Sequence, residues 1–150
     1  GTLADFEAFL RAAADRGIRV FLDLVVNHTS DQHPWFQAAR RDPGSRFRGY
    51  YVWADEPPPP LPGAKPIFPG EEAAVWTRDD RAGAYYFHRF RHFQPELHTG
   101  NPAVQAEITR VMDFWLSFPI AGFRIDAASH MLEDKGVPGT APKQGHGLLK

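Results

Sequence analysis

The sequence contains no cysteine. Disulfide scaffolds, thiolate metal sites and cysteine nucleophiles are therefore excluded, and such a chain suits a reducing cytoplasm. We expect a cytoplasmic location, although the composition is also compatible with secretion. The chain begins at Gly1, in what resembles a helix cap, and has no start methionine there, so we expect it to be part of a longer protein.

Long apolar runs and an excess of charge of either sign are missing as well. No apolar stretch approaches the roughly 18 residues that a transmembrane helix requires, so no membrane span is predicted. The formal net charge is −1 and no long basic run occurs, which argues against nucleic acid or a membrane surface as the main partner. With 43% hydrophobic and 23% charged residues, the chain has an ordinary globular composition and is long enough for one domain.

The first segment has the features of an α-helix. Thr2 and Asp5 have the spacing of a capping box, and apolar residues recur at helical intervals from Leu3 to Leu10. Gly17 is a typical residue just past a helix C-terminus. We expect a helix of about four turns here.

A dense apolar strand is predicted next. Residues 18–26 are rich in β-branched side chains, which is typical of a parallel strand covered on both faces. Asp23 interrupts this run with a charge. Five polar residues, 27–31, follow at the point where the carboxyl end of a parallel strand presents side chains to a ligand.

The middle of the chain, from residue 29 to about residue 98, consists of shorter and less regular pieces. A brief helix is predicted over 33–41, and strands rich in aromatic residues over 50–53 and 85–90. Residues 57–69 include seven prolines and are expected to form an extended loop.

A second long helix and a second strand complete the pattern. Asn101 and Pro102 are typical of an N-cap and a first helical position, and apolar residues recur on one face until Pro119. A strand is predicted over residues 122–128. Helix, strand, irregular excursion, helix and strand is the order expected of a parallel α/β fold.

Two charged residues lie in the middle of the second strand. Arg124 and Asp126 are two residues apart and point to the same face, where burying them costs several kcal/mol, as a rough estimate, unless they are paired or used. A structural ion pair would explain them in isolation. However, a right-handed crossover makes the two strands parallel neighbours, so that polar residues of both strands converge at one end. These residues are Asp23, Asn27, His28, Arg124, Asp126 and His130.

These motifs resemble those of a known enzyme family. The pattern D-x-x-x-N-H at 23–28 and G-F-R-x-D-A-x-x-H at 122–130 resemble the first two signature regions of the alpha-amylase family, glycoside hydrolase family 13. The sequence Q-P-E-L-H at 94–98 resembles the family's Q-P-D-L-N element. Residues 27–36 and 51–53 are most similar to the branch of trehalose synthases, oligo-1,6-glucosidases and alpha-glucosidases.

The resemblance implies a fold and a division into domains. The fold class would be α/β, as a fragment of a TIM (β/α)8 barrel from about the second helix through the fourth strand. A small irregular α+β domain would be inserted after the third strand. Residues 1–28 and 99–150 would then be barrel segments, and residues 29–98 the inserted domain.

The resemblance also implies roles for individual residues. Asp126 would be the nucleophile that attacks the anomeric carbon, and Arg124 would keep this carboxylate ionised by lowering its pKa. The reaction would proceed through a covalent glucosyl enzyme with retention of configuration. His28, Gln94 and His130 would bind substrate, the two histidines through sugar hydroxyls. Asp23 would be structural, at the base of the pocket.

Trehalose synthases bind a calcium ion near this site, and the resemblance implies a matching set of ligands. These are Asn27, Glu96 and Glu133, with the main chain of His130 and Met131. Such oxygen ligands suit a hard cation. Glu96 and His98 stand where the family usually has Asp and Asn, so the carboxylate arm is one methylene longer. No organic cofactor is implied.

Small α-linked glucosides such as maltose, trehalose and short maltooligosaccharides are the substrates that the resemblance implies. The protein would either hydrolyse them or convert maltose to trehalose by intramolecular transfer. The resemblance does not reach the family's Glu general acid/base, so we expect these 150 residues alone to be inactive. We also expect them to be marginally stable or prone to aggregation, because many apolar faces would lack neighbours.

Two alternatives remain at this stage. The chain could belong to a non-catalytic relative that binds sugar or acts as a scaffold. His88 and His92 have the i, i+4 spacing of a zinc site, but their segment is predicted as a strand and lacks the H-E-x-x-H pattern. The oligomeric state is not indicated by any sequence feature.

Overall fold

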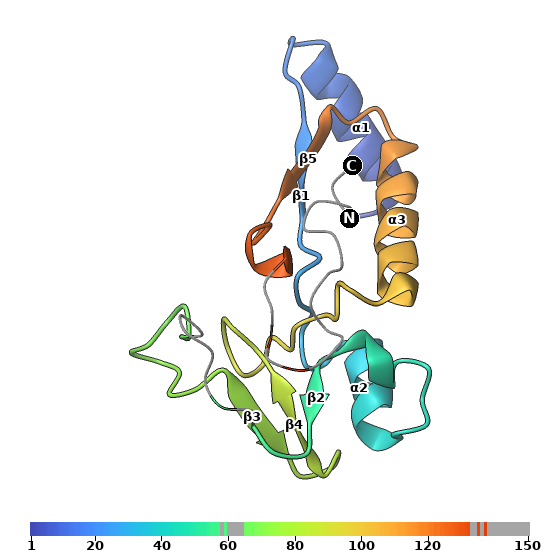
Figure 1. The fold of residues 1–150 in the computed structure, drawn as a ribbon. Coiled ribbons are helices and arrows are strands. Elements are labelled where there is room, and N and C mark those ends of the chain that lie inside the picture. The colour runs from blue at the N-terminus through green and yellow to red at the C-terminus, as the bar shows by residue number, and fades with distance from the viewer. Residues whose placement is uncertain (58, 60–64, 133–134, 136, 138–150) are drawn as a thin grey trace.

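The computed structural model describes residues 1–57, 59, 65–132, 135 and 137. Two parts of the molecule are visible in Figure 1. The strands β1 (Phe21–Leu24) and β5 (Gly122–Ile125) lie at one end with the helices α1 (Leu3–Ala14) and α3 (Pro102–Leu116). The helix α2 (Pro34–Arg41) and the remaining strands lie at the other end.

The helices begin where their capping residues predict. The Thr2 side chain accepts a hydrogen bond from the backbone N–H of Asp5, and the Asp5 carboxylate accepts one from the N–H of Thr2, which forms the predicted capping box. Asn101 caps α3 by accepting from the N–H of Ala103 at 2.9 Å. Both long helices and the brief helix α2 are therefore confirmed.

The strands β1 and β5 pair in parallel, as predicted. In their register Asp23 is opposite Arg124, and Leu24 is opposite Ile125. The predicted extent of the first strand, residues 18–26, is wrong, because only four residues pair with β5. Within the described residues Phe21 on β1 is 56% exposed, which agrees with the expectation that apolar faces of these 150 residues would lack neighbours. Among the described residues β1 pairs with β5 alone, in a ladder of four residue pairs.

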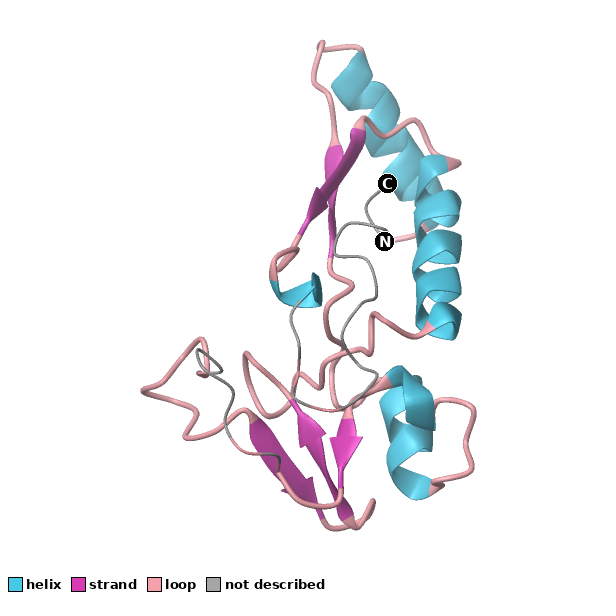
Figure 2. Ribbon diagram, viewed as in Figure 1, coloured by secondary structure: helices cyan, strands magenta, loops and turns pink. Residues whose placement is uncertain are grey.

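The second part contains a three-stranded antiparallel sheet in the order β2 (Trp53–Ala54), β4 (Ala84–Phe87) and β3 (Trp76–Asp79), seen in magenta in Figure 2. Residues 48–50 form a 3₁₀ turn (η1, Arg48–Tyr50) in place of the predicted start of a strand. The sequence did not predict β3, because two of its four residues are charged.

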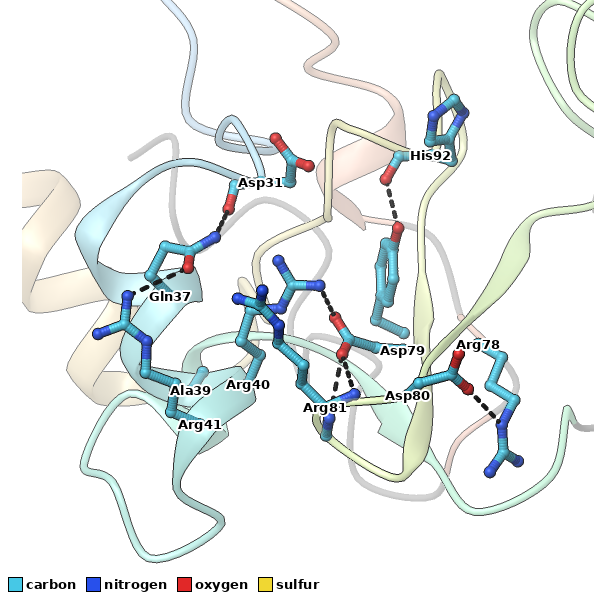
Figure 3. Close-up of polar contacts among 12 residues, drawn as sticks. Asp31, Gln37, Ala39, Arg40, Arg41, Arg78, Asp79, Asp80, Arg81 and His92 are labelled. Carbon is cyan, nitrogen blue, oxygen red and sulfur yellow. Dashed lines mark hydrogen bonds and ion pairs between the residues drawn. The ribbon is translucent and has the colours of Figure 1, made fainter.

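An ion pair joins the helix and the sheet of this second part. Arg40 on α2 lies 2.7 Å from the Asp79 carboxylate at the end of β3, and Asp79 also accepts from the backbone N–H groups of Arg81 and Ala82 (Figure 3). The Asp79 side chain is almost fully buried, whereas the neighbouring Asp80 is exposed. A buried carboxylate with these partners fixes the β3–β4 turn against α2.

In the part of the chain that the structure describes, the larger of two hydrophobic clusters extends from one part of the molecule into the other, and the smaller one comprises Val52, Val75 and Phe87. The buried members of the larger cluster come from β1, α2, the middle segments and α3. They are Leu24, Val26, Phe36, Ala39, Tyr50, Tyr51, Tyr86, Leu97, Val104, Ile108 and Met131. Met131 belongs to a second 3₁₀ turn (η2, His130–Leu132) that follows β5, so the core holds the end of this strand against both parts. Among the described residues no helix is long and apolar enough to cross a bilayer.

Candidate active site

Three charged residues form a cluster at the ends of β1 and β5. Arg124 Nη1 lies 3.1 Å from Asp23 Oδ2 and 3.1 Å from Asp126 Oδ1. The two strands produce this arrangement, because parallel register places Asp23 beside Arg124 and the alternation of β5 places Asp126 on the same face. Sequence reasoning predicted this convergence, and the structure brings the three residues together.

The turn after β5 fixes the position of Asp126. Its backbone N–H donates to the carbonyl of Leu24 at 3.0 Å, which extends the parallel ladder by one step. The next residue, Ala127, has a φ of +53°, a conformation that residues other than glycine rarely adopt. A strained residue directly after a candidate nucleophile is the kind of feature that concentrates at functional sites.

The charges in this cluster are more exposed than a buried strand implied. The side chains of Asp23, Arg124 and Asp126 are 60%, 64% and 31% exposed. Hydrogen bonding to Asp23 and the negative charges of Asp23 and Asp126 raise the pKa of Arg124, which therefore remains cationic. Within the described residues, much of this group is open to solvent.

The polar segment after β1 pairs with the segment that precedes α3. The N–H of Leu97 donates to the carbonyl of Asn27 at 2.8 Å, and the N–H of Thr29 donates to that of Pro95 at 3.1 Å. His28 is opposite Glu96 in this short antiparallel contact. Gln94 thereby reaches His28, with 3.2 Å between the two Nε2 atoms. Two of the predicted substrate-binding residues are therefore in direct contact.

Phe90 connects these residues to the third predicted substrate-binding residue. Its ring centroid lies 5.1 Å from that of His28 and 5.5 Å from that of His130, with an edge-on geometry to the latter. Sequence reasoning missed Phe90, because an aromatic residue at the end of an aromatic-rich strand is indistinguishable from local core. Its position four residues before Gln94, just past β4, was the available signal.

The surroundings of His28 lower the pKa of its imidazole. Burial lowers its pKa, and the negative charges of Glu96 and Asp126 oppose this effect only in part. The imidazole is therefore neutral at pH 7 and can exchange hydrogen bonds with an uncharged hydroxyl group.

A cavity of about 730 Å³ adjoins the cluster. Asp23, His28 and Gln94 contribute polar groups to its wall, and the rest is largely apolar and comes from β1, α3 and nearby residues. Arg124 and Asp126 do not line it, so the cavity extends along β1 and is not centred on the predicted nucleophile.

Most of the predicted calcium ligands that the structure describes are already paired with protein donors. Glu96 Oε1 accepts from the N–H of Arg89 at 3.0 Å, and Oε2 is paired with the ammonium of Lys135. The Met131 carbonyl accepts from the Thr99 hydroxyl at 2.5 Å.

The remaining predicted ligands complete this test of fit. The carbonyl of His130 lies 3.4 Å from Lys135 Nζ. The fully buried side-chain amide of Asn27 has no hydrogen-bond partner among the described residues. Glu133 lies outside the described residues. With Glu96 and the His130 carbonyl facing the Lys135 ammonium, Asn27 is the described ligand whose side-chain oxygen remains unpaired, which is far fewer than the six to eight oxygens that calcium takes. The calcium ligand set stays a prediction.

The histidine pair considered for zinc does not form a metal site. His88 Nε2 lies 2.8 Å from the Thr77 hydroxyl, whereas His92 pairs with Glu72 at 3.0 Å. Over the described parts of the chain, no three His, Cys, Asp or Glu side chains are grouped so that they could hold a metal ion.

Comparison with known proteins gives consistent matches. The model of the alpha amylase catalytic domain matches residues 1–149. A trehalose synthase of Pimelobacter sp. (strain R48) is 46% identical over 150 residues, which are 100% of this chain and 26% of that protein. An oligo-1,6-glucosidase of Parageobacillus thermoglucosidasius is 37% identical, over 97% of this chain and 25% of that protein.

Solved structures agree with these matches. Bacillus licheniformis trehalose-6-phosphate hydrolase superposes with a TM-score of 0.82 at 33% identity, over 99% of this chain and 28% of that one. Isomaltulose synthase from Klebsiella sp. LX3 gives a TM-score of 0.80 at 35% identity, over 92% of this chain and 24% of that one. The chain thus spans about a quarter of the length of these relatives. It belongs to the alpha-amylase catalytic-domain family, whose members matched here are glycosidases and transglucosidases.

Proposed function

We propose that the protein containing this chain acts on small α-glucosides with retention of configuration, through a covalent glucosyl bond to Asp126. The observation that carries this proposal is the Asp126 carboxylate at the end of β5, 3.1 Å from Arg124 and next to the Ala127 turn. In this proposal residues 1–28 and 99–150 contribute strands and helices to a (β/α)8 barrel, and residues 29–98 form the domain inserted after its third strand.

In the first step a carboxylate oxygen of Asp126 attacks the anomeric carbon, and the bond from that carbon to the leaving oxygen breaks. The leaving oxygen takes a proton from a general acid. Asp23 is unsuited to this role, because its carboxylate is already engaged by the guanidinium of Arg124. We assign the acid to a carboxyl group outside the two signature regions, about 5 to 5.5 Å from Asp126 as retaining enzymes require.

In the second step an oxygen nucleophile gives its proton to the carboxyl group that acted as acid, which is now a base, attacks the glucosyl carbon and displaces the Asp126 carboxylate. Water gives hydrolysis, whereas a hydroxyl of the retained glucose gives an isomer of the substrate. His28 and Gln94 are suited to bind sugar hydroxyls, since both are polar groups on the wall of the cavity. His130 contacts the same Phe90 ring as His28 and would bind another sugar hydroxyl.

Maltose and trehalose are the substrates that we favour, with transfer of the trehalose-synthase type as the reaction. The support is the 46% identity to a trehalose synthase over the whole of this chain. Hydrolysis of α-glucosides is the competing outcome, supported by the similarity to an oligo-1,6-glucosidase. The absence of cysteine supports a cytoplasmic location.

The test uses the full-length protein, which is incubated with maltose while trehalose and glucose are separated by chromatography. We expect trehalose as the main product, and Asp126→Ala should abolish both trehalose and glucose formation. Asp113→Ala, an exposed position on α3, is the matched control and should retain turnover. Wild-type turnover in Asp126→Ala would rule out Asp126 as the nucleophile.

A further inference from the structure

Glu96 is a carboxylate fully buried between the two parts of the molecule. It lies in the segment after β4 and is opposite His28 in the short antiparallel contact. One of its oxygens accepts from the backbone N–H of Arg89, and the other faces Lys135. A buried carboxylate requires a compensating positive charge close to it.

Lys135 supplies that charge from the segment after η2. Its side chain is only 1% exposed, although lysine is among the residue types that are least often buried. The ammonium pairs with Glu96 Oε2, lies 3.4 Å from the His130 carbonyl and lies 5.2 Å from the centroid of the Phe87 ring. An anion, a carbonyl dipole and an aromatic face are all groups that stabilise a cation.

We infer that the ammonium group of Lys135 is the resident cation of this site and makes the protein independent of calcium for its folded structure. Two of the groups that calcium would need, the Glu96 carboxylate and the His130 carbonyl, are the groups that Lys135 contacts. A divalent ion on the same carboxylate would stand beside the ammonium, and repulsion between the two charges would weaken its binding.

Lys135 also contacts two segments of the candidate active site. The backbone of Glu96 is opposite that of His28 in the short antiparallel contact. The His130 carbonyl belongs to the 3₁₀ turn that follows Asp126 and Ala127. One ammonium group therefore ties together the two segments that present these histidines. Lys135 is a positioning residue. Its role in cation binding and stability is independent of which glucoside the protein uses.

The experiment measures calcium binding and thermal unfolding in the full-length protein. Calorimetric titration of the wild type with calcium should show no binding at this site, and its unfolding midpoint should be the same in chelator and in millimolar calcium. Lys135→Met should unfold at a lower temperature in chelator and should bind calcium at least about tenfold more tightly than the wild type, because the Glu96 carboxylate and the His130 carbonyl lose the ammonium and become available beside the unpaired Asn27 amide. Calcium should restore part of its lost stability.

Two further variants make the result decisive. Lys65→Met removes an exposed lysine and should change neither quantity. The double variant Glu96→Gln with Lys135→Met removes both buried charges, so it should fold even if Lys135→Met does not, and it should bind no calcium. The inference is overturned if the wild type binds calcium as tightly as Lys135→Met, or if chelation lowers the midpoint of the wild type. Neither result would bear on the role of Asp126.

Discussion

Arg124 is shared by two carboxylates, and this sharing determines what its removal would do. Its guanidinium lies at the same distance, 3.1 Å, from Asp23 on β1 and from Asp126 on β5. Because all three side chains are partly exposed, solvent screens their interaction and the cluster contributes little to the stability of the fold. Its charges are instead placed where a carboxylate nucleophile must stay ionised.

Replacing Arg124 should therefore separate activity from stability. In the full-length protein we expect Arg124→Met to lower kcat/KM on maltose by roughly 100-fold, an effect typical of losing one charged group of an active site. The unfolding midpoint should stay close to that of the wild type. Arg110→Met is the control, because Arg110 is equally exposed and pairs with Glu107 on α3. A large loss of stability with unchanged turnover would show that the cluster is structural.

His88 provides a second prediction at the scale of a residue. Burial lowers its pKa from 6.5 to about 4, so the unfolded chain binds a proton at this histidine more readily than the folded chain does. The stability that neutral His88 contributes is complete above pH 6.5 and is lost as the pH falls from 6.5 towards 4. The shift corresponds to a loss on the order of 3 kcal/mol.

The measurement is chemical unfolding of the wild type and of His88→Gln from pH 7 to pH 4. Gln keeps a group that can bond to the Thr77 hydroxyl but does not titrate. We expect the stability of the wild type to fall more steeply with decreasing pH than that of His88→Gln. Parallel curves would show that the proton uptake of His88 is not coupled to unfolding.

Among the elements, capped helices were easier to predict than strands. The capping residues Thr2 and Asn101 act locally, so the starts of α1 and α3 could be located from neighbouring residues alone. Strands depend on partners distant in the chain. Residues 18–26 have the composition of one long strand, yet only the residues opposite β5 pair. Charged β3 was missed because its pairing with β4 cannot be seen in its own sequence.

The candidate site shows the same division between local and distant information. Asp23, Arg124 and Asp126 could be placed together because parallel strands have a simple register. Phe90 and Lys135 could not, since each reaches the site through an irregular segment whose course depends on tertiary packing. Within the described residues the side chains of Arg124 and Asp23 are more than half exposed, so their burial could not be judged from the strand pattern alone.

The contact between α2 and β3 carries a prediction at the scale of an element. Asp79→Ala would leave Arg40 partly buried without its carboxylate and would remove the acceptor for two backbone N–H groups of the turn. Breaking such a pair from one side costs about 3 kcal/mol or more. Asp80→Ala is the matched control, because this neighbour is 93% exposed and should change stability by less than about 0.5 kcal/mol. Urea unfolding measures both, and equal losses would contradict the role assigned to Asp79.

At the scale of the whole molecule, apolar surface is exposed on strands and helices together. Phe21 and Val25 in and beside β1 are about half exposed, as are Phe9 on α1 and Phe114 on α3. Aromatic contacts between Phe6 and Trp115 or Phe118 connect the two helices, but they leave these outer faces open. Apolar faces of this kind mark surfaces that pack against other protein segments.

We therefore predict that the 150 residues by themselves self-associate and lack cooperative unfolding, whereas the full-length protein remains dispersed. Light scattering after gel filtration measures the association, and calorimetry measures the cooperativity. The isolated polypeptide should also fail to cleave an aryl α-glucoside, because the two signature regions supply the nucleophile and not the general acid that protonates the leaving oxygen. The double substitution Phe21→Lys with Phe114→Lys should reduce association by adding charge to two exposed apolar positions, without restoring activity. A monomeric wild-type fragment with a single sharp thermal transition, or one that turns over the glucoside, would show that the described elements are sufficient for a stable and functional unit.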